Sequence, residues 1–241
     1  MRKVAAMVRA YLLNRKELEK IKYDEAILSE GRREKIAKIK HEDDKELGAC
    51  VELLLIHALK ELDPEIKLPL QITEEEGGNL LLDTPVAGYE KLYFNMSHSK
   101  DYALCAVCDE PVGVDIECVK TKDVSHMDKI LHETENKILG FITNSEEQKH
   151  YFYECWVTKE SYLKNLGCGL TVRPRDFYVE EDVLETNDSN LKKRYVHVYK
   201  ANEIENADWH FDASYRMAIC TQKKDPDTKV VLLNAEDFSD L

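Results

Sequence analysis

The stretch Gly113-Val114-Asp115-Ile116-Glu117 alternates acidic and apolar residues in the manner of a β-strand. Side chains two positions apart leave the same face of a strand, so both carboxylates point to one side. A third acid, Glu160, lies downstream in the helical pattern WVTKESYLK at residues 156–164. Three carboxylates that converge at low dielectric repel one another unless a cation joins them. The pattern therefore predicts a metal site formed by Asp115, Glu117 and Glu160.

The chemistry of these residues indicates which ion would bind. Oxygen-only ligands suit a hard ion such as Mg²⁺, which keeps several waters and commonly recruits substrate phosphates. Lys164 lies one helical turn after Glu160 and shares its helix surface, where its ammonium group can reach a phosphate. The interpretation is metal-assisted phosphate chemistry with Mg²⁺ as cofactor.

Composition bounds the class of protein. The 241 residues fall between one and two typical domains, and their net charge of −13 argues against a protein that coats nucleic acid or an anionic membrane. The apolar run Val4–Val8 is too short for a signal peptide, and no later run could span a bilayer. We therefore expect a cytoplasmic protein with no nucleic-acid or membrane partner.

Cysteine usage agrees with a reducing compartment. Seven cysteines would leave an unpaired thiol in an oxidising one. Cys105 and Cys108 form a C-x-x-C, but they lie in a predicted strand where positions three apart face opposite sides. We expect buried thiols there rather than a redox or zinc site.

The first half of the chain is expected to combine helices with a sheet. Leucine and valine recur at helical spacing from Asp43 to Leu62, which predicts an amphipathic helix that stops before Pro64. Two shorter helical patterns precede it, at 14–22 and 29–41. The predicted strands are Val4–Val8, Lys91–Met96, Tyr102–Cys108 and Val112–Glu117.

The second half centres on a helix predicted from Ser145 to Leu166. Ser145 and Gln148 resemble a capping box, and Gly167 is a natural C-terminal stop. Lys159 falls within the expected buried stripe, where it is either functional, an internal ion pair or a stem that reaches out to water. The other stripe residues are Phe152, Cys155, Trp156, Leu163 and Leu166.

A short internal echo predicts that the two halves are related. The strand Tyr102–Cys108 is echoed by a predicted strand at Tyr215–Thr221. Each strand follows a Ser that is itself preceded by a Phe at the same offset: Phe94 to Ser97, and Phe211 to Ser214. Between the long helix and the second of these strands, 177–184 and 193–199 predict a hairpin around Asn187-Asp188-Ser189-Asn190. The acidic motifs would then lie where the halves meet, a common location for ligand clefts.

Three segments in this order resemble the Sfp-type 4′-phosphopantetheinyl transferases. Phe94-Asn95-Met96-Ser97-His98-Ser99 is similar to the coenzyme A loop of that family, and Val112–Glu117 to its metal strand. Trp156–Leu170, closing with Gly167-Cys168-Gly169-Leu170, is similar to its W-x-x-K-E-[SA]-x-x-K…G-x-G-[LM] motif. A weaker match, Arg32-Arg33-Glu34-Lys35, corresponds to a basic helix segment that holds the 3′-phosphate of the coenzyme. Gly77-Gly78-Asn79 departs from the Gly-Lys-Pro turn of many relatives.

The resemblance implies both the fold and the reaction. The fold would be α+β, with two similar α/β halves related by pseudo-twofold symmetry, 1–117 and 118–241, and an active site in the cleft between them. The reaction would transfer 4′-phosphopantetheine from coenzyme A to a serine of an apo acyl or peptidyl carrier protein and release 3′,5′-ADP. A monomer is expected, because one chain completes the cleft.

The resemblance also implies a role for each site residue. Asp115, Glu117 and Glu160 would hold Mg²⁺, and Glu160 would accept the serine proton, directly or through a metal-bound water. Asp115, Glu160 and Lys164 would form the catalytic set. Coenzyme A would be bound by Arg32, Lys35, Ser97, His98, Ser99 and Lys164.

Two other functions remain open. Asp-x-Glu with a downstream Glu and Lys also describes metal-dependent nucleases, although the acidic balance counts against one. A catalytically inactive module that binds coenzyme A or a carrier protein is the other alternative. Any carrier is expected to dock on apolar residues of the segment 124–141, including Met127, Ile130, Leu131, Ile138 and Leu139, unless these simply cover the core.

Overall fold

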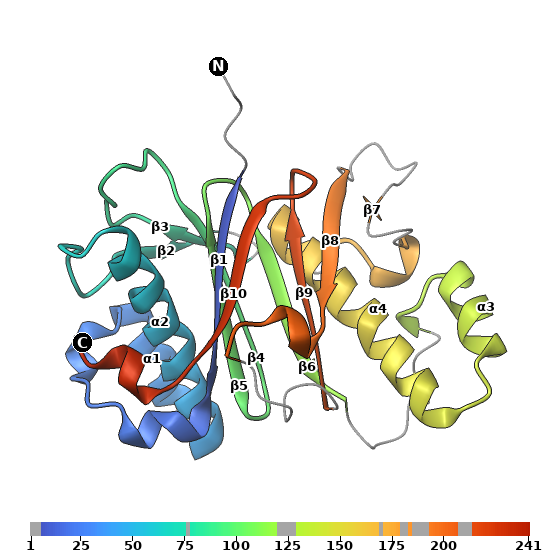
Figure 1. The fold of residues 1–241 in the computed structure, drawn as a ribbon, viewed down its shortest axis with the longest axis horizontal. Coiled ribbons are helices and arrows are strands. Elements are labelled where there is room, and N and C mark those ends of the chain that lie inside the picture. Colours follow the sequence, from blue (N-terminus) through green and yellow to red (C-terminus); the bar gives the residue numbers. More distant parts are fainter. Residues whose placement is uncertain are drawn as a thin grey trace.

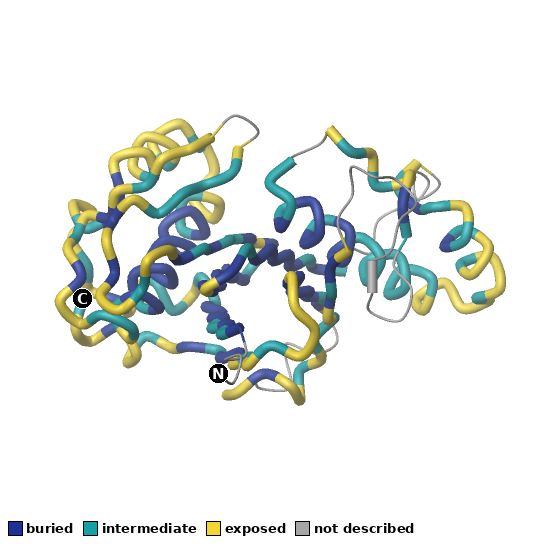
Figure 2. Tube along the Cα trace, turned by 90° about the horizontal axis from the view of Figure 1, so that it is seen from above, coloured by how far each residue is buried: buried dark blue, intermediate teal, exposed yellow. Residues whose placement is uncertain are grey.

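The computed structural model describes residues 6–75, 78–119, 129–168, 171–178, 183–184, 193–206 and 214–241. Two four-stranded sheets lie in the middle of the molecule, and the helices cover their outer sides (Figure 1). Buried residues gather in the strands and on the inner faces of the two long helices, whereas the outlying turns are mostly exposed (Figure 2). The fold is therefore α+β, as expected.

The first sheet has the strand order β10-β1-β5-β4, formed by Asp227–Leu233, Met7–Asn14, Tyr102–Cys108 and Tyr93–Ser99. Strand β1 is antiparallel to β5 and parallel to β10. Helix α2 (Glu42–Leu62) packs on this sheet through a nearly continuous apolar face. Three acidic residues occupy its first turn, which stabilises the positive end of the helix dipole.

The second sheet has the order β6-β9-β8-β7, formed by Gly113–Cys118, Tyr215–Thr221, Arg194–Tyr199 and Val183–Leu184. All of its strand pairs are antiparallel. Helix α4 (Ser145–Leu166) covers one face, and α3 (Glu133–Phe141) lies beside α4 (Figure 1).

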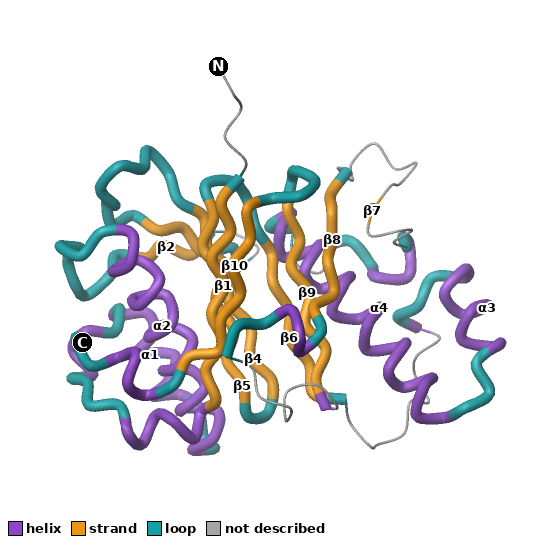
Figure 3. Tube along the Cα trace, viewed as in Figure 1, coloured by secondary structure: helices purple, strands orange, loops and turns teal. Residues whose placement is uncertain are grey.

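The remaining elements are short. They are α1 (Glu30–Lys38), the hairpin β2 (Ile72–Glu74) and β3 (Leu80–Leu82), and the 3₁₀ turns η1 (Arg15–Lys20), η2 (Glu25–Ile27), η5 (Pro174–Asp176), η6 (Ala201–Glu203) and η7 (Ala235–Phe238). Figure 3 shows the helical turns outside the central strands. No helix in the described part of the chain is long and apolar enough to cross a membrane.

The order of elements repeats in the two halves. In each half, a strand is followed along the chain by a long helix and then by antiparallel strands, the last of which pairs with the first strand. The order of neighbouring strands in the sheet is β1-β5-β4 in one half and β6-β9-β8 in the other. The echoing segments β5 and β9 hold equivalent places in this order. A pseudo-twofold relation between the halves stays a prediction.

The sheets divide the chain differently from the expected halves 1–117 and 118–241. Strand β6, assigned to the first half, is hydrogen bonded to β9 in the second sheet. Strand β10, assigned to the second half, is hydrogen bonded to β1 and buries Val230, Val231 and Leu233. Judged by hydrogen bonds between strands, the chain passes from the first sheet to the second in the turn before Gly113 and returns to the first sheet before Asp227.

Most expected elements form, with differences at their ends. Helix α4 begins and ends where predicted, and Gly167 adopts the left-handed conformation with φ of 64°. Its cap is Asn144, whose side chain accepts from the amides of Glu146 and Glu147, so the Ser145 capping box was wrong. The predicted tip at 187–190 and Phe211 lie outside the described residues.

The predicted interior was partly right. Cys105 and Cys108 are both buried and lie in different core clusters, on opposite faces of β5 as predicted. In α4, Leu163 is buried, whereas Phe152, Cys155, Trp156 and Leu166 are only partly so. Val157 and Tyr162 take the inner face instead, because α4 lies on the second sheet along that side.

Candidate active site

Strand β6 and helix α4 meet at Gly113, where no side chain would fit. A Cβ there would overlap the Ser161 carbonyl oxygen and the Asn165 amide nitrogen of α4. Asn165 also donates from Nδ2 to the carbonyls of Pro111, at 2.7 Å, and Cys220, at 3.0 Å. Glycine thus lets the backbones of β6 and α4 approach closely. This brings the turn of α4 that carries Glu160 and Lys164 beside the acidic residues of β6.

Asp115 lies at the centre of this junction and is buried, with 4% of its surface exposed. Its Oδ1 accepts hydrogen bonds from Ser97 Oγ at 2.8 Å and from Lys164 Nζ at 2.7 Å. Its Oδ2 is buried and has no partner among the described residues. A buried carboxylate oxygen without a partner is costly, so this atom is suited to bind a cation.

Glu117 is held on both sides. Its Oε2 accepts from Ser99 Oγ at 2.7 Å, and its Oε1 accepts from Trp156 Nε1 at 3.3 Å. Ser97 and Ser99 are alternate residues of β4, so both face β6 and each donates to one of its acids. The edge strands of the two sheets are therefore joined through the candidate metal ligands.

Glu160 approaches the same place from α4. Burial raises the pKa of its carboxyl group, and the negative charges of Asp115 and Glu117 raise it further, while Lys164 opposes them. Both acidic residues of β6 thus act on Glu160 as like charges, which disfavour its ionised form.

The donor set fits a hard cation. All three groups offer oxygen, Asp115 Oδ2 has no partner in the described part of the chain, and the charges of Asp115 and Glu117 disfavour the ionised form of Glu160. The described residues include no group of three or more His, Cys, Asp or Glu side chains already arranged around a common point. In this arrangement the Lys164 ammonium is the cation paired with Asp115. The assignment of the three acids as ligands stays a prediction.

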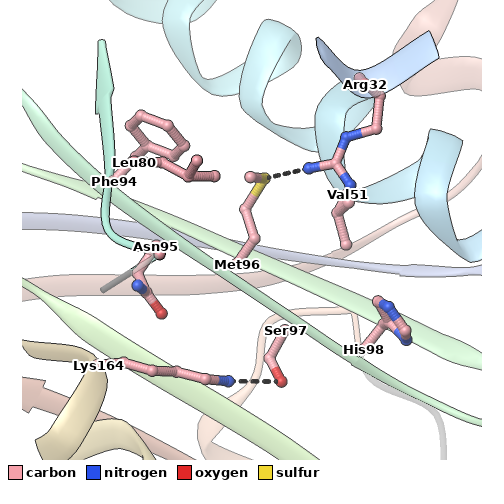
Figure 4. A pocket seen from close by; sticks show the side chains of 10 residues that line it. Arg32, Val51, Leu80, Phe94, Asn95, Met96, Ser97, His98 and Lys164 are labelled. Atoms are coloured by element: carbon pink, nitrogen blue, oxygen red, sulfur yellow. Dashed lines mark hydrogen bonds between the residues drawn. The ribbon is translucent and has the colours of Figure 1, made fainter. Parts of the chain in front are cut away.

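A cavity of about 250 Å³ is lined by Ser97 and Lys164, the two residues that donate to Asp115 (Figure 4). It is lined by Arg32, Val51, Gly78, Leu80, Phe94, Asn95, Met96, Ser97, His98 and Lys164. None of these described lining residues is acidic, although the chain as a whole carries a net charge of −13. A cavity whose charged groups are all basic favours an anionic ligand.

The predicted coenzyme-binding residues fall into two groups. Arg32, Ser97, His98 and Lys164 line the cavity. Lys35 and Ser99 are not among its lining residues, because Lys35 Nζ pairs with Glu74 at 2.6 Å and Ser99 faces Glu117.

The pKa of the His98 imidazole is lowered from its ordinary value. Desolvation lowers the pKa of its imidazole, and the positive charges of Arg32 and Lys164 lower it further. The neutral ring can still donate one hydrogen bond to an anion.

Lys159 forms an internal ion pair. Its side chain has no exposed surface, and its Nζ lies 2.9 Å from Glu135 Oε2 of α3. It also donates to the carbonyls of Pro174, at 2.8 Å, and Phe177. Among the alternatives for Lys159, the ion pair is confirmed.

Sequence reasoning missed two polar residues that shape the site. Asn165 ties α4 to the sheet, and Glu52 of α2 binds Arg32 at 3.1 Å. Glu52 interrupts an apolar run at helical spacing, and this signal could have identified it.

Comparisons with known proteins agree with this geometry. The model of the 4′-phosphopantetheinyl transferase superfamily matches residues 111–220, which include β6, α4 and β9. The chain is 28% identical over 222 residues to 4′-phosphopantetheinyl transferase Sfp of Bacillus subtilis, covering 88% of this chain and 90% of that protein.

Two further relatives carry similar names. Psf-1 of Bacillus pumilus is 28% identical over 78% of this chain and 76% of its own length. HetI of a Nostoc species is 37% identical over 33% of this chain and 34% of its own length. With its carboxylates, basic cavity and matching order of segments, the chain is similar to the 4′-phosphopantetheinyl transferase superfamily over residues 111–220 and to the Sfp-type enzyme of Bacillus subtilis over most of its length.

Proposed function

We propose that the protein transfers the 4′-phosphopantetheine group of coenzyme A to a serine of an apo acyl or peptidyl carrier protein, with Mg²⁺, and releases 3′,5′-ADP. The observation that carries this proposal is the basic cavity lined by Arg32 and by Lys164, which pairs with Asp115. Coenzyme A is an extended anion with a pyrophosphate and a separate 3′-phosphate. Basic groups at both ends of the cavity suit such a ligand better than a single phosphate.

The carboxylates Asp115, Glu117 and Glu160 would hold the metal ion. When bound, Mg²⁺ would neutralise the pyrophosphate oxygens, on which negative charge grows as the bond breaks. Ser97 and Ser99 orient two of these acids through their hydroxyl donors. Such supporting bonds fix the direction of a ligand.

In the reaction, a bond forms between the carrier serine Oγ and the phosphorus that bears the pantetheine group. The bond from that phosphorus to the bridging oxygen breaks, and the electron pair leaves with 3′,5′-ADP. Lys164 neutralises the phosphate oxygens from the cavity wall. Glu160 is the proposed acceptor of the serine proton.

A single chain supplies the groups of the proposed site. Strand β4 of the first sheet contributes Ser97 and His98, and α4 on the second sheet contributes Lys164. This supports a monomer whose halves are related by a pseudo-twofold axis. All seven cysteines are free, which supports the cytoplasm as the compartment.

The carrier is proposed to dock on α3. Two large apolar side chains of α3 are exposed, Ile138 at 45% and Phe141 at 84%. Leu131 is buried and cannot contact a partner, and residues 124–128 lie outside the described part of the chain. Because the chain is strongly acidic, local apolar contact is a better basis for recognising an acidic carrier than long-range attraction.

Product analysis tests the proposal against its alternatives. The protein is incubated with coenzyme A, Mg²⁺ and an apo carrier protein, and the carrier is weighed by intact-mass spectrometry. A carrier heavier by one phosphopantetheine group is expected. Binding of coenzyme A with no change in carrier mass would favour an inactive module, and cleavage of added DNA or RNA would favour a nuclease.

A further inference from the structure

Glu52 is a buried acid in the middle of an apolar helix. It lies in α2, its side chain is 1% exposed, and its neighbours in the chain, Val51 and Leu53, belong to the core. Removing a carboxylate from water is unfavourable unless strong partners replace the water. The residues that bind Glu52 therefore indicate why an acid occupies this position.

All three donors to Glu52 come from the start of α1. The Ser29 amide donates to Oε1 at 2.5 Å, Ser29 Oγ donates to Oε2 at 2.9 Å, and Arg32 Nε donates to Oε2 at 3.1 Å. Ser29 Oγ also accepts from the Arg32 amide at 3.3 Å, as the N-cap of α1. One buried carboxylate thus fixes the first turn of α1 and the guanidinium that α1 carries.

The rest of the Arg32 guanidinium faces the cavity. A terminal nitrogen lies 3.8 Å from the sulfur of Met96, and Arg32 lines the cavity across from Lys164, with Met96 and Ser97 between them (Figure 4). Lys164 is the basic residue paired with Asp115, where the reacting pyrophosphate is proposed to lie. Arg32 therefore faces the part of the ligand that lies away from the reacting phosphorus.

We propose that Glu52, together with Ser29, is a positioning residue that holds Arg32 against the 3′-phosphate of coenzyme A. The inference rests on the proposed function, because the 3′-phosphate is the other anionic group of coenzyme A, separate from the pyrophosphate. Arginine is long and flexible, and a partner that fixes Nε leaves its two terminal nitrogens oriented as a pair of donors. Glu52 acts through Arg32 and does not touch the ligand.

Ligand preference is the property to measure, since a purely structural role would not alter it. Isothermal titration with 3′,5′-ADP and with 5′-AMP gives the preference for the 3′-phosphate in each variant. In Glu52→Gln we expect that preference to fall about tenfold, the size typical of a lost hydrogen bond to a charged group. Affinity for 5′-AMP should stay near the wild-type value.

A double-mutant cycle and a matched control sharpen the test. Arg32→Ala should lower the preference by at least as much, and adding Glu52→Gln to it should cause no further loss. Glu46→Gln is the control, because Glu46 is on the same helix and binds Arg15 at 2.8 Å, away from the cavity. The Glu46→Gln variant should prefer 3′,5′-ADP over 5′-AMP by the same factor as the wild type. If Glu52→Gln does not fold by circular dichroism, Ser29→Ala is measured instead, with a fall of about threefold expected.

A folded Glu52→Gln or Ser29→Ala variant that keeps the wild-type preference would overturn the inference. So would full additivity with Arg32→Ala, or a wild type that binds 3′,5′-ADP no better than 5′-AMP. These readouts are independent of transfer. A wild type that shows the preference but modifies no carrier would contradict the proposed function and leave this inference standing.

Discussion

Replacing Gly113 by alanine should push α4 away from β6. We expect this to lower activity although Gly113 is not one of the proposed site residues. The added Cβ would overlap backbone atoms of Ser161 and Asn165 and would lie 3.0 Å from the Asn165 Cα. Backbone atoms cannot rotate away, so α4 must shift as a body by about 1 Å. The shift would lengthen the 2.7 Å contact between Lys164 and Asp115 beyond hydrogen-bonding range.

Both consequences of this shift can be measured. Overpacking of this kind costs about 1–3 kcal/mol in the free energy of unfolding, which urea titration followed by circular dichroism would report. A misplacement of about 1 Å in a catalytic group can cost about 100-fold in rate, so kcat/KM for carrier modification should fall by that order in protein that remains folded.

Gly140→Ala is the matched control. Gly140 lies in α3, and a Cβ there would have no atom within 4 Å. This variant should keep its activity and be slightly stabilised, since alanine favours a helix more than glycine does. A Gly113→Ala protein with wild-type stability and wild-type kcat/KM would refute the reasoning that close backbone contact positions the site.

The remaining predictions concern three other positions. Glu160→Gln should abolish measurable transfer while the protein stays folded, because the amide cannot accept the serine proton; a folded variant that still modifies the carrier in an intact-mass assay would contradict this. Lys159→Met should leave Glu135 buried without a cationic partner and lower the free energy of unfolding by about 3–5 kcal/mol in urea titration. A loss of less than about 1 kcal/mol would argue against a buried pair. Phe141→Asp should raise the KM for the carrier and leave the KM for coenzyme A unchanged, and an unchanged carrier KM in folded protein would reject docking on α3.

Elements whose own residues define them could be predicted from the sequence. Helix α4 ends at Gly167, where the backbone needs a left-handed conformation, and this signal is local. Strand β5 is a continuous apolar run and β9 a mostly apolar one, and their predicted bounds are those observed. Strand β10 was missed as a partner of β1, because the two lie at opposite ends of the chain and no local pattern identifies such a pairing.

The same distinction holds for the site. The prediction that Asp115, Glu117 and Glu160 form one metal site followed from strand and helix periodicity, and their role as ligands stays a prediction. The sequence could not show that Ser97 would donate to Asp115, since that contact depends on two edge strands from different sheets. Nor could it show that Lys35 would pair with Glu74 rather than line the cavity.

The most direct test of the central claim is the stoichiometry of the reaction. Wild-type protein, coenzyme A and Mg²⁺ are mixed with an apo carrier, and 3′,5′-ADP is quantified by chromatography alongside the modified carrier by mass spectrometry. We predict one 3′,5′-ADP released for each carrier serine modified, and neither product with Asp115→Ala. Release of 3′,5′-ADP without modified carrier, or equal yields from the Asp115→Ala protein, would contradict transfer by this carboxylate site.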